Sequence, residues 1–506
     1  MAAIDRSHLI AKNTLLLYFR TLITIVVTFY TIRVLLSVLG AEDFGVFGIL
    51  SGVIILISFF NKSMTTSTQR FINYEIGLGE KGNVKEIFAT TLTCHLIVAI
   101  LLVIIAETAG LWFVINVLNI PEERMSAALW IYQLYLAYMV FFIIASPFNA
   151  LILAHEKMNI FTYVSIVDVL LKLAVVFVIQ YFAGDKLILY VLLLSVVSLL
   201  SNGYYVYYCR TKYKELNFRL SWNKSRLIKL FTFSGWMTAG ASADTLSEQG
   251  VNILINIFFG PVYNATKLLA GKIQEGVYML ISNLMTAVKP QIVKSYSQND
   301  TSFLYKLVFS SSKFSFFLLY FITLPFFFQA DFFLGLWLTE VPEYLRIFVQ
   351  LIIVDLLVQA SFVSMGILSQ ASAKIKKYQI IVSLNFLSVF CFTALFYKIG
   401  FPVYAAFIIT IIMSVLAFFA RLYEIKKTLN FPVRKFLSDV TLRLVCTTLL
   451  SVVLPIIIYI LADSSIYWVC VSIVVCFIST GTVIWLVGLN KFEKDFIVKK
   501  IKERFQ

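Results

Sequence analysis

Long apolar runs separated by short polar or basic segments make up most of the chain. A helix that crosses a membrane needs about 20 mostly apolar residues, and fourteen stretches meet this requirement. The pattern therefore predicts an all-α polytopic membrane protein with about 14 transmembrane helices. The predicted spans are 13–38, 44–62, 88–116, 127–150, 160–182, 187–208, 230–259, 265–288, 304–328, 345–370, 378–397, 402–425, 441–462 and 466–489.

The composition supports this class and excludes others. Hydrophobic residues make up 60% of the 506 residues and charged residues 14%, whereas soluble domains are about 45–50% apolar and about 25% charged. So few polar residues cannot cover a water-facing surface, which excludes a soluble enzyme, a disordered chain and a disulfide scaffold. An outer-membrane barrel is disfavoured because its strands give short alternating segments instead of long apolar runs.

The basic residues gather in alternate loops. Lys and Arg total 42 against 27 Asp and Glu, and the net charge of +15 would suggest nucleic-acid binding in a soluble protein. Here 33 of the 42, Arg421 among them, fall in the segments that face the cytoplasm when both termini are placed there, and five fall outside. The positive-inside rule therefore predicts cytoplasmic termini. Binding of anionic lipid heads is the minor interpretation, and no nucleic-acid partner is expected.

Motifs of soluble chemistry are absent or lack their context. The six cysteines form no CxxC pair, so neither a metal site nor a disulfide framework is indicated. The GxGxxG match at 77–82 has no preceding strand and is interpreted as a cytoplasmic loop. No Walker A, HExxH or GxSxG sequence occurs, and the outside loops are about 15 residues or shorter. These observations favour a transporter without cofactor over an enzyme.

The two halves of the sequence resemble each other at a nearly constant offset. Segments 39–40, 64–65, 119–122 and 154–157 match 259–260, 285–286, 340–343 and 371–374, at offsets of 217–221 residues. This offset covers six spans, an even number, so both halves enter the membrane in the same orientation. Transporters built from such parallel repeats hold the substrate between the halves and rock them against each other.

The repeat sets the predicted domain organisation. We expect two parallel six-helix lobes around a central cavity, followed by a C-terminal helical hairpin. The N-lobe covers 1–208, a basic cytoplasmic linker 209–229, the C-lobe 230–427, the extra hairpin 428–489 and a basic cytoplasmic tail 490–506.

Nine ionisable residues lie within the predicted spans. Each would cost about 3 kcal/mol at a lipid-facing helix centre, so we expect them to face the protein interior, a partner or a water-filled cavity. A residue near a span end could instead extend to the interface. The nine are Arg20, Arg33, Asp168, Lys172, Asp244, Glu248, Lys272, Glu275 and Asp355.

Their spacing suggests both pairs and a cavity. Asp168 and Lys172 are four residues apart and share one helix face, so they form either a structural pair or part of a site. Asp244 and Glu248 lie in a stretch of small and polar residues, which favours a cavity-lining helix over tight helix packing. The next span adds Lys272 and Glu275 in a mixed cluster with Gln274, and Asp355 stands alone on the tenth span.

Several stretches resemble one family of transporters. Residues 39–47, LGAEDFGVF, resemble the "LGxED(F/Y)G" signature of bacterial polysaccharide-biosynthesis flippases. Segments 146–150, 154–158 and 168–173 resemble the region of spans four and five in O-antigen and capsule exporters. Fourteen spans in two lobes plus a hairpin match the multidrug/oligosaccharidyl-lipid/polysaccharide exporter superfamily, which includes the multidrug and toxin exporters.

The resemblance implies a function and a site. A flippase of this family moves an undecaprenyl-pyrophosphate-linked oligosaccharide from the cytoplasmic to the outer leaflet of the bacterial inner membrane. Membrane lipids, the lipid-linked glycan and other polysaccharide-assembly proteins are then the expected partners. Pyrophosphate needs cationic partners, and Arg20, Arg33, Lys172 and Lys272 are the candidate substrate-binding cations.

The five acids qualify this interpretation. The family is expected to have a cationic cavity, but here four intramembrane bases meet five acids. Asp168, Asp244, Glu248, Glu275 and Asp355 would pair with bases or bind the coupling ion, H⁺ or Na⁺. The alternative is a proton- or sodium-coupled multidrug exporter of the same superfamily, which Glu248 and Asp355 would suit. A peptidoglycan-precursor flippase and a role outside transport also remain open.

Overall fold

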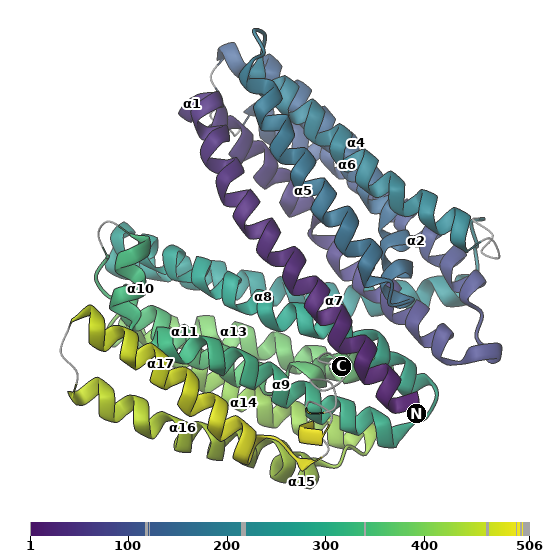
Figure 1. Ribbon diagram of the computed structural model, residues 1–506. Coiled ribbons are helices and arrows are strands. Elements are labelled where there is room, and N and C mark those ends of the chain that lie inside the picture. The colour runs from purple at the N-terminus through teal and green to yellow at the C-terminus, as the bar shows by residue number, and fades with distance from the viewer. Residues whose placement is uncertain are drawn as a thin grey trace. The chain divides into compact units, whose positions relative to one another are not determined.

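The structure is a computed structural model that describes residues 2–116, 120, 122–213, 219–338, 341–461, 465–491, 493–495 and 498. Within these residues it contains helices and no strand (Figure 1). The α-helices are α1 (Ala2–Gly77), α2 (Val84–Ile105), α3 (Leu111–Asn116), α4 (Glu122–Ala154), α5 (Met158–Gln180), α6 (Lys186–Lys212), α7 (Lys224–Phe259), α8 (Pro261–Ser297), α9 (Thr301–Phe328), α10 (Ala330–Trp337), α11 (Leu345–Ala360), α12 (Val363–Ser372), α13 (Lys376–Lys398), α14 (Ala405–Leu429), α15 (Val433–Phe436), α16 (Leu442–Leu461) and α17 (Ile466–Val483). Short 3₁₀ and π segments join some of them.

Helix length and hydropathy confirm a multi-pass membrane protein. Among the described residues, ten helical segments are long and apolar enough to cross a membrane. They are Val84–Asn116, Glu122–Ala154, Met158–Gln180, Lys186–Lys212, Thr301–Phe328, Leu345–Ser372, Lys376–Lys398, Ala405–Leu429, Val433–Leu461 and Ile466–Gly488. Each of these overlaps one of the predicted spans over most of its length, but the total of fourteen is not confirmed and stays a prediction.

The first two predicted spans lie in one helix. α1 is continuous through 76 residues, from Ala2 to Gly77. At 1.5 Å per residue such a helix is on the order of 110 Å long if straight, several times the apolar thickness of a bilayer. The segment therefore has the length of two crossings without the loop that the sequence pattern predicts.

The chain folds into two compact units. Unit 1 comprises Met1–Thr238 and Lys289–Asp300, and unit 2 comprises Ala239–Val288 and Thr301–Gln506. Helices α7 and α8 contribute residues to both units. The lobe, linker, hairpin and tail boundaries given above stay predictions.

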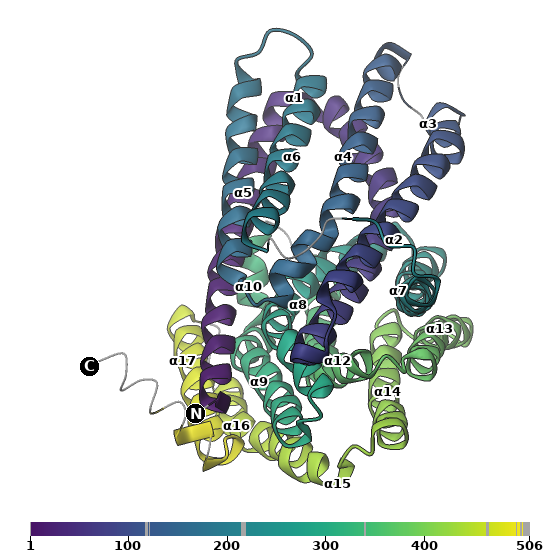
Figure 2. The same cartoon turned by 90° about the vertical axis from the view of Figure 1, so that its right-hand side faces the viewer.

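Unit 1 is a bundle in which α1, α4, α5 and α6 pack along one another (Figure 2). Its core is almost entirely aliphatic and aromatic: Leu50, Ile131, Tyr132 and Ile143 are fully buried within it. Burial of such side chains contributes about 1.5–3 kcal/mol each when it removes them from water. In a membrane their close packing sets which helix faces meet, and the polar side chains that remain inside need partners of their own.

Asp43, in the signature stretch 39–47, forms part of a cluster of ion pairs. Asp43 on α1 pairs with the Arg124 guanidinium on α4, whose other nitrogen lies 2.8 Å from Asp185. Asp185 also caps α6, because its Oδ1 accepts the backbone N–H groups of Leu187 and Ile188. The ion pairs of Asp43 and Arg124 thus connect three helices. They lie at the end of unit 1 that the charge pattern assigns to the outside.

The α4–α5 loop binds the last turns of α8 within unit 1. Glu156 in this loop accepts hydrogen bonds from Gln291 at 2.7 Å and from the Lys294 ammonium at 2.5 Å. Beside it, the His155 ring stacks on Tyr213 with a centroid distance of 4.5 Å. Burial, followed by the Lys294 and Lys157 charges, lowers the pKa of His155 to about 4, against the opposing effect of Glu156.

The backbone supports the internal repeat. Glu156 and Ala373 both adopt left-handed conformations, each with a φ of 59°. Side chains other than Gly, Asn and Asp seldom take this conformation. The two residues lie 217 positions apart, which is the offset of the matching segments around them. A left-handed residue therefore occurs at the equivalent position of the loop between α4 and α5 and of the loop between α12 and α13.

Unit 2 pairs α13 with α14 and α16 with α17, and α11 packs against both α9 and α14 (Figure 2). A buried ion pair fastens the end of the chain to α9. Lys313 and Glu493 are 2% and 4% exposed, and their Nζ and Oε2 atoms are 2.7 Å apart. Ser310 donates to Oε1 of the same carboxylate at 3.1 Å, and the backbone N–H of Asn490 donates to Oε2 at 2.9 Å.

Candidate functional site

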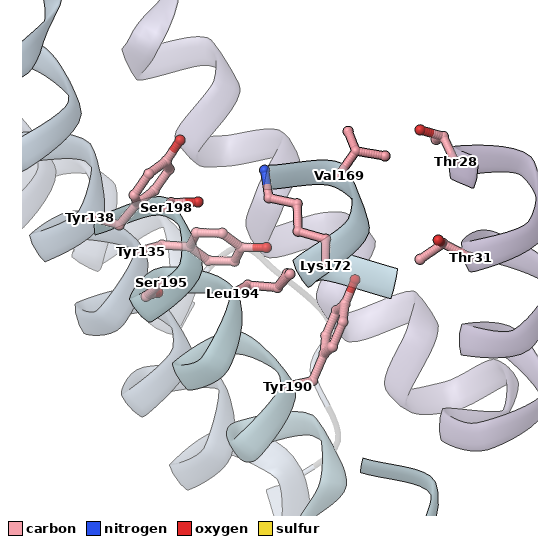
Figure 3. Close-up of a pocket in the computed structure, with 10 residues that line it drawn as sticks. All are labelled: Thr28, Thr31, Tyr135, Tyr138, Val169, Lys172, Tyr190, Leu194, Ser195 and Ser198. Atoms are coloured by element: carbon pink, nitrogen blue, oxygen red, sulfur yellow. The ribbon is translucent and has the colours of Figure 1, made fainter. Parts of the chain in front are cut away.

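Four helices of unit 1 line an open cavity of about 270 Å³ (Figure 3). α1, α4, α5 and α6 supply its lining, and the packing that brings them together is the core of the unit. The lining residues are Thr28, Thr31, Tyr135, Tyr138, Val169, Lys172, Tyr190, Leu194, Ser195 and Ser198.

Most residues of this lining carry a hydroxyl group, although its exposed surface is mainly apolar. Seven of the ten residues carry one, although every helix involved is apolar enough to cross a membrane or belongs to a predicted span. Some of these hydroxyls are held by their own helix: Thr31 donates to the Val27 carbonyl at 2.7 Å and Ser195 to the Val191 carbonyl at 2.8 Å. Their oxygens remain acceptors. The cavity can therefore both donate hydrogen bonds to a polyhydroxylated ligand and accept them.

A lysine enters the same cavity as part of an ion pair. The Lys172 ammonium lies 2.7 Å from Asp168, one turn earlier on α5, and the side chains are 37% and 21% exposed. Ser201 on α6 donates to the other carboxylate oxygen at 2.9 Å. Figure 3 shows the Lys172 side chain between the tyrosines of α4 and the threonines of α1. The pair is thus neutral as a whole, with its cation on the cavity wall.

Arg20 is not among the residues that line this cavity. Its guanidinium carbon lies 5.0 Å from the centre of the Phe161 ring on α5, and the ring itself stacks with Tyr205 on α6. One terminal nitrogen is 3.4 Å from the Thr21 hydroxyl. The Nε atom is buried and has no hydrogen-bond partner in the described part of the chain. The backbone of Arg33 lies in α1, but its side chain lies outside the described residues.

The other predicted site residues lie in unit 2 and do not meet in one place. Lys272 and Glu275 pair along α8 at 3.1 Å, and both are about 70% exposed. Asp244 and Glu248 are exposed on α7. The Lys267 ammonium is 3.4 Å from the backbone carbonyl of Glu248. An intrahelical pair this exposed contributes little stability.

Asp355 on α11 has a different environment. It is only 4% exposed. Ser414 on α14 donates to its Oδ1 at 2.6 Å, and Gln359 donates to its Oδ2 at 2.7 Å. Among the described residues it forms no ion pair, so both of its partners are neutral.

The structure thus brings together Asp168 and Lys172 at the cavity, and Lys272 and Glu275 elsewhere. Sequence analysis missed the aromatic and serine lining of α4 and α6. Its signal is spacing: Tyr135 and Tyr138, like Ser195 and Ser198, are three residues apart and share one face of an otherwise apolar helix.

Comparison with known proteins identifies the family. A family model described as "Polysaccharide biosynthesis protein" matches residues 10–298, more than half of the chain. Among curated proteins no sequence matches significantly.

Solved structures share the fold. A mutant of the Vibrio cholerae MATE transporter VcmN matches with a TM-score of 0.74 and 14% identity, covering 85% of this chain and 99% of that one. An outward-facing multidrug resistance MATE family transporter of the MOP superfamily gives 0.69 and 14%, covering 81% and 93%. A MOP superfamily transporter from Pyrococcus furiosus, whose binding pocket is described as having reverse polarity, gives 0.68 and 14%, covering 82% and 96%. The chain has a transporter fold related to these proteins, and it belongs to the polysaccharide biosynthesis protein family.

Proposed function

We propose that the protein is a flippase for an undecaprenyl-pyrophosphate-linked oligosaccharide. It moves the sugar head from the cytoplasmic to the outer leaflet of the bacterial inner membrane, with both termini in the cytoplasm, by alternating access. The observation that supports this most is the cavity of unit 1, where seven residues with hydroxyl groups line the same space as the Lys172 side chain. Hydroxyls suit a sugar, and an ammonium suits an anionic group of the same ligand.

The cavity fits a glycan better than a cationic drug. A lipophilic cation would meet the Lys172 ammonium on the cavity wall, which disfavours it. The similarity to MATE transporters is below 25% identity and concerns the fold alone. A specific observation for the drug-exporter alternative is Asp355, a buried acid without a basic partner among the described residues.

Asp355 serves the flippase equally well as an ion-coupling residue. A buried carboxylate held only by neutral donors is costly inside a membrane unless it binds a cation. A proton or Na⁺ that binds here removes this cost, so that occupancy of the site can favour one conformation over another. The flippase cycle would then draw on an ion gradient.

The test is the leaflet position of lipid-linked oligosaccharide in cells that lack the protein. Access of an impermeant glycan-binding protein to the outer leaflet of spheroplasts reports this position. We expect the oligosaccharide to remain cytoplasmic without the protein and to be delivered again on re-expression. Lys172→Met should not restore delivery, whereas Tyr163→Phe, on the exposed side of the same helix, should. Normal delivery in the absence of the protein and of any redundant flippase would refute the proposal. Dye efflux that depends on the protein would then support the drug exporter.

A further inference from the structure

Arg421 is a cation whose place in unit 2 the charge pattern does not predict. Counted by sequence, it is one of the cytoplasmic basic residues that orient the chain. The structure places it within α14, two turns before the helix ends, and half-buried. Its guanidinium carbon lies 4.6 Å from the centre of the Phe362 ring and 5.7 Å from that of the Tyr378 ring.

The guanidinium has no anionic partner within the described residues. Arg421 forms no ion pair and no hydrogen bond there, and its Nε is buried without an acceptor. A guanidinium carries five N–H donors in one plane. Stacking on an aromatic ring occupies the face of the group and leaves the in-plane donors available. A buried donor without an acceptor is costly, so an anion from outside the chain would stabilise this arrangement.

Unit 1 contains the same arrangement on the equivalent ring. Tyr378 follows Phe161 by 217 positions, the offset at which the left-handed Glu156 and Ala373 recur. Arg20 lies on the Phe161 ring at 5.0 Å and also has a buried Nε without an acceptor among the described residues.

The two arginines are not themselves equivalent in the repeat. Arg20 comes from α1, whereas Arg421 comes from α14, and the position 217 residues before Arg421 is Tyr204. Duplication of one half therefore does not account for the match. The shared feature is the geometry, a guanidinium on an aromatic ring with open donors, which each unit builds from a different helix.

The site lies at the end of unit 2 that the charge pattern assigns to the cytoplasm. α13 begins at Lys376, two residues after Lys374, and α14 ends with Lys426 and Lys427 in its last turn. The phosphate groups of lipids in the cytoplasmic leaflet lie at such helix ends, where basic side chains attract them. Arg in particular recognises phosphate through its fork of donors.

We propose that Arg421, held on the rings of Phe362 and Tyr378, is a phosphate-binding residue that takes the pyrophosphate of a lipid-linked substrate at the cytoplasmic end of unit 2. The chain then has two such arginines, one in each unit. The identity of the ligand rests on the proposed function; the binding of a lipid-linked phosphate does not.

The experiment measures binding of radiolabelled farnesyl pyrophosphate to the purified full-length protein in phosphatidylcholine nanodiscs. Arg421→Gln should weaken binding about tenfold or more, the factor expected from a lost charge-assisted hydrogen bond. Arg434→Gln removes an exposed arginine of the neighbouring helix α15 and should leave binding unchanged. Wild-type affinity in Arg421→Gln, or an equal loss in Arg434→Gln, would overturn the proposal.

Two further measurements distinguish loss of binding from misfolding of the variant, and a lipid-linked pyrophosphate from an ordinary lipid headgroup. In the wild-type protein, inorganic pyrophosphate should slow modification of Arg421 by phenylglyoxal, read by mass spectrometry, and not that of Arg434. An unchanged rate at Arg421 would overturn the proposal without any variant. Phosphatidylglycerol added to the nanodiscs should not displace farnesyl pyrophosphate, and equal competition would assign the site to ordinary lipid heads instead. Because binding needs no transport, a failed leaflet assay would leave this result interpretable.

Discussion

The buried ion pair between Lys313 and Glu493 gives a quantitative prediction of stability. The two side chains are 2% and 4% exposed, and Lys313 has no other carboxylate within salt-bridge distance among the described residues. Glu493→Gln therefore leaves a buried ammonium without a counter-charge. Removal of one partner of such a pair costs about 3–5 kcal/mol, whereas replacement of both partners is often close to neutral.

The double variant tests whether the loss of stability in Glu493→Gln comes from the unpaired charge. Lys313→Met with Glu493→Gln removes both charges, and the amide oxygen can still accept the hydrogen bond that Ser310 donates to the carboxylate. We expect this variant to lie within about 1 kcal/mol of the wild type. Lys306→Met, at an exposed position of the same helix, should also leave the free energy of unfolding unchanged, because exposed charges contribute little to stability.

Titration with sodium dodecyl sulfate in mixed micelles, followed by tryptophan fluorescence, measures the free energy of unfolding of each variant. The double-mutant cycle then isolates the coupling between the two residues. A single variant within 1 kcal/mol of the wild type would contradict the reasoning. So would a double variant that loses as much stability as the two single variants added together.

The remaining predictions concern pH, the cavity and ion coupling. Burial and the Lys294 charge lower the pKa of His155 to about 4, so the unfolded chain binds a proton first and stability falls as the pH drops from about 6.5 towards 4. His155→Phe should reduce the loss of thermal stability between pH 7 and pH 5, and an unchanged loss would assign it to other groups. Tyr138→Phe removes a cavity hydroxyl and should slow glycan delivery up to about tenfold, whereas Tyr163→Phe should not; equal rates would exclude Tyr138 from the site. Asp355→Asn should abolish transport driven by an ion gradient in proteoliposomes without unfolding the protein, and gradient-driven transport at the wild-type rate would contradict the coupling role.

Local rules predicted those parts of the structure that depend on neighbours in sequence. Apolar runs located the helices because a membrane requires helices of this length. The four-residue spacing of Asp168 and Lys172 predicted their contact, which the structure shows at 2.7 Å. The offset between the halves also has a structural counterpart, in the left-handed Glu156 and Ala373.

Contacts between segments that are far apart in the sequence could not be predicted from local spacing. Glu156 meets Lys294 across 138 residues, and neither residue stands out from the other charges of its loop. The Asp355 carboxylate finds its partner in Ser414, 59 residues later. The hydroxyls of the cavity converge only because four helices pack with these faces inward. Such convergence depends on helix rotation, which the sequence of one helix does not determine.

The Asp168–Lys172 pair has no counterpart in the second half. The positions 217 residues later are Asn385 and Val389, and the Asn385 amide donates to the Met413 carbonyl at 2.8 Å. At equivalent positions the first half thus has a charged pair beside the cavity, and the second half has a neutral contact between helices. In the proposed flippase this difference would assign recognition of the sugar to the first half, where the cavity lies, and ion coupling at Asp355 to the second half.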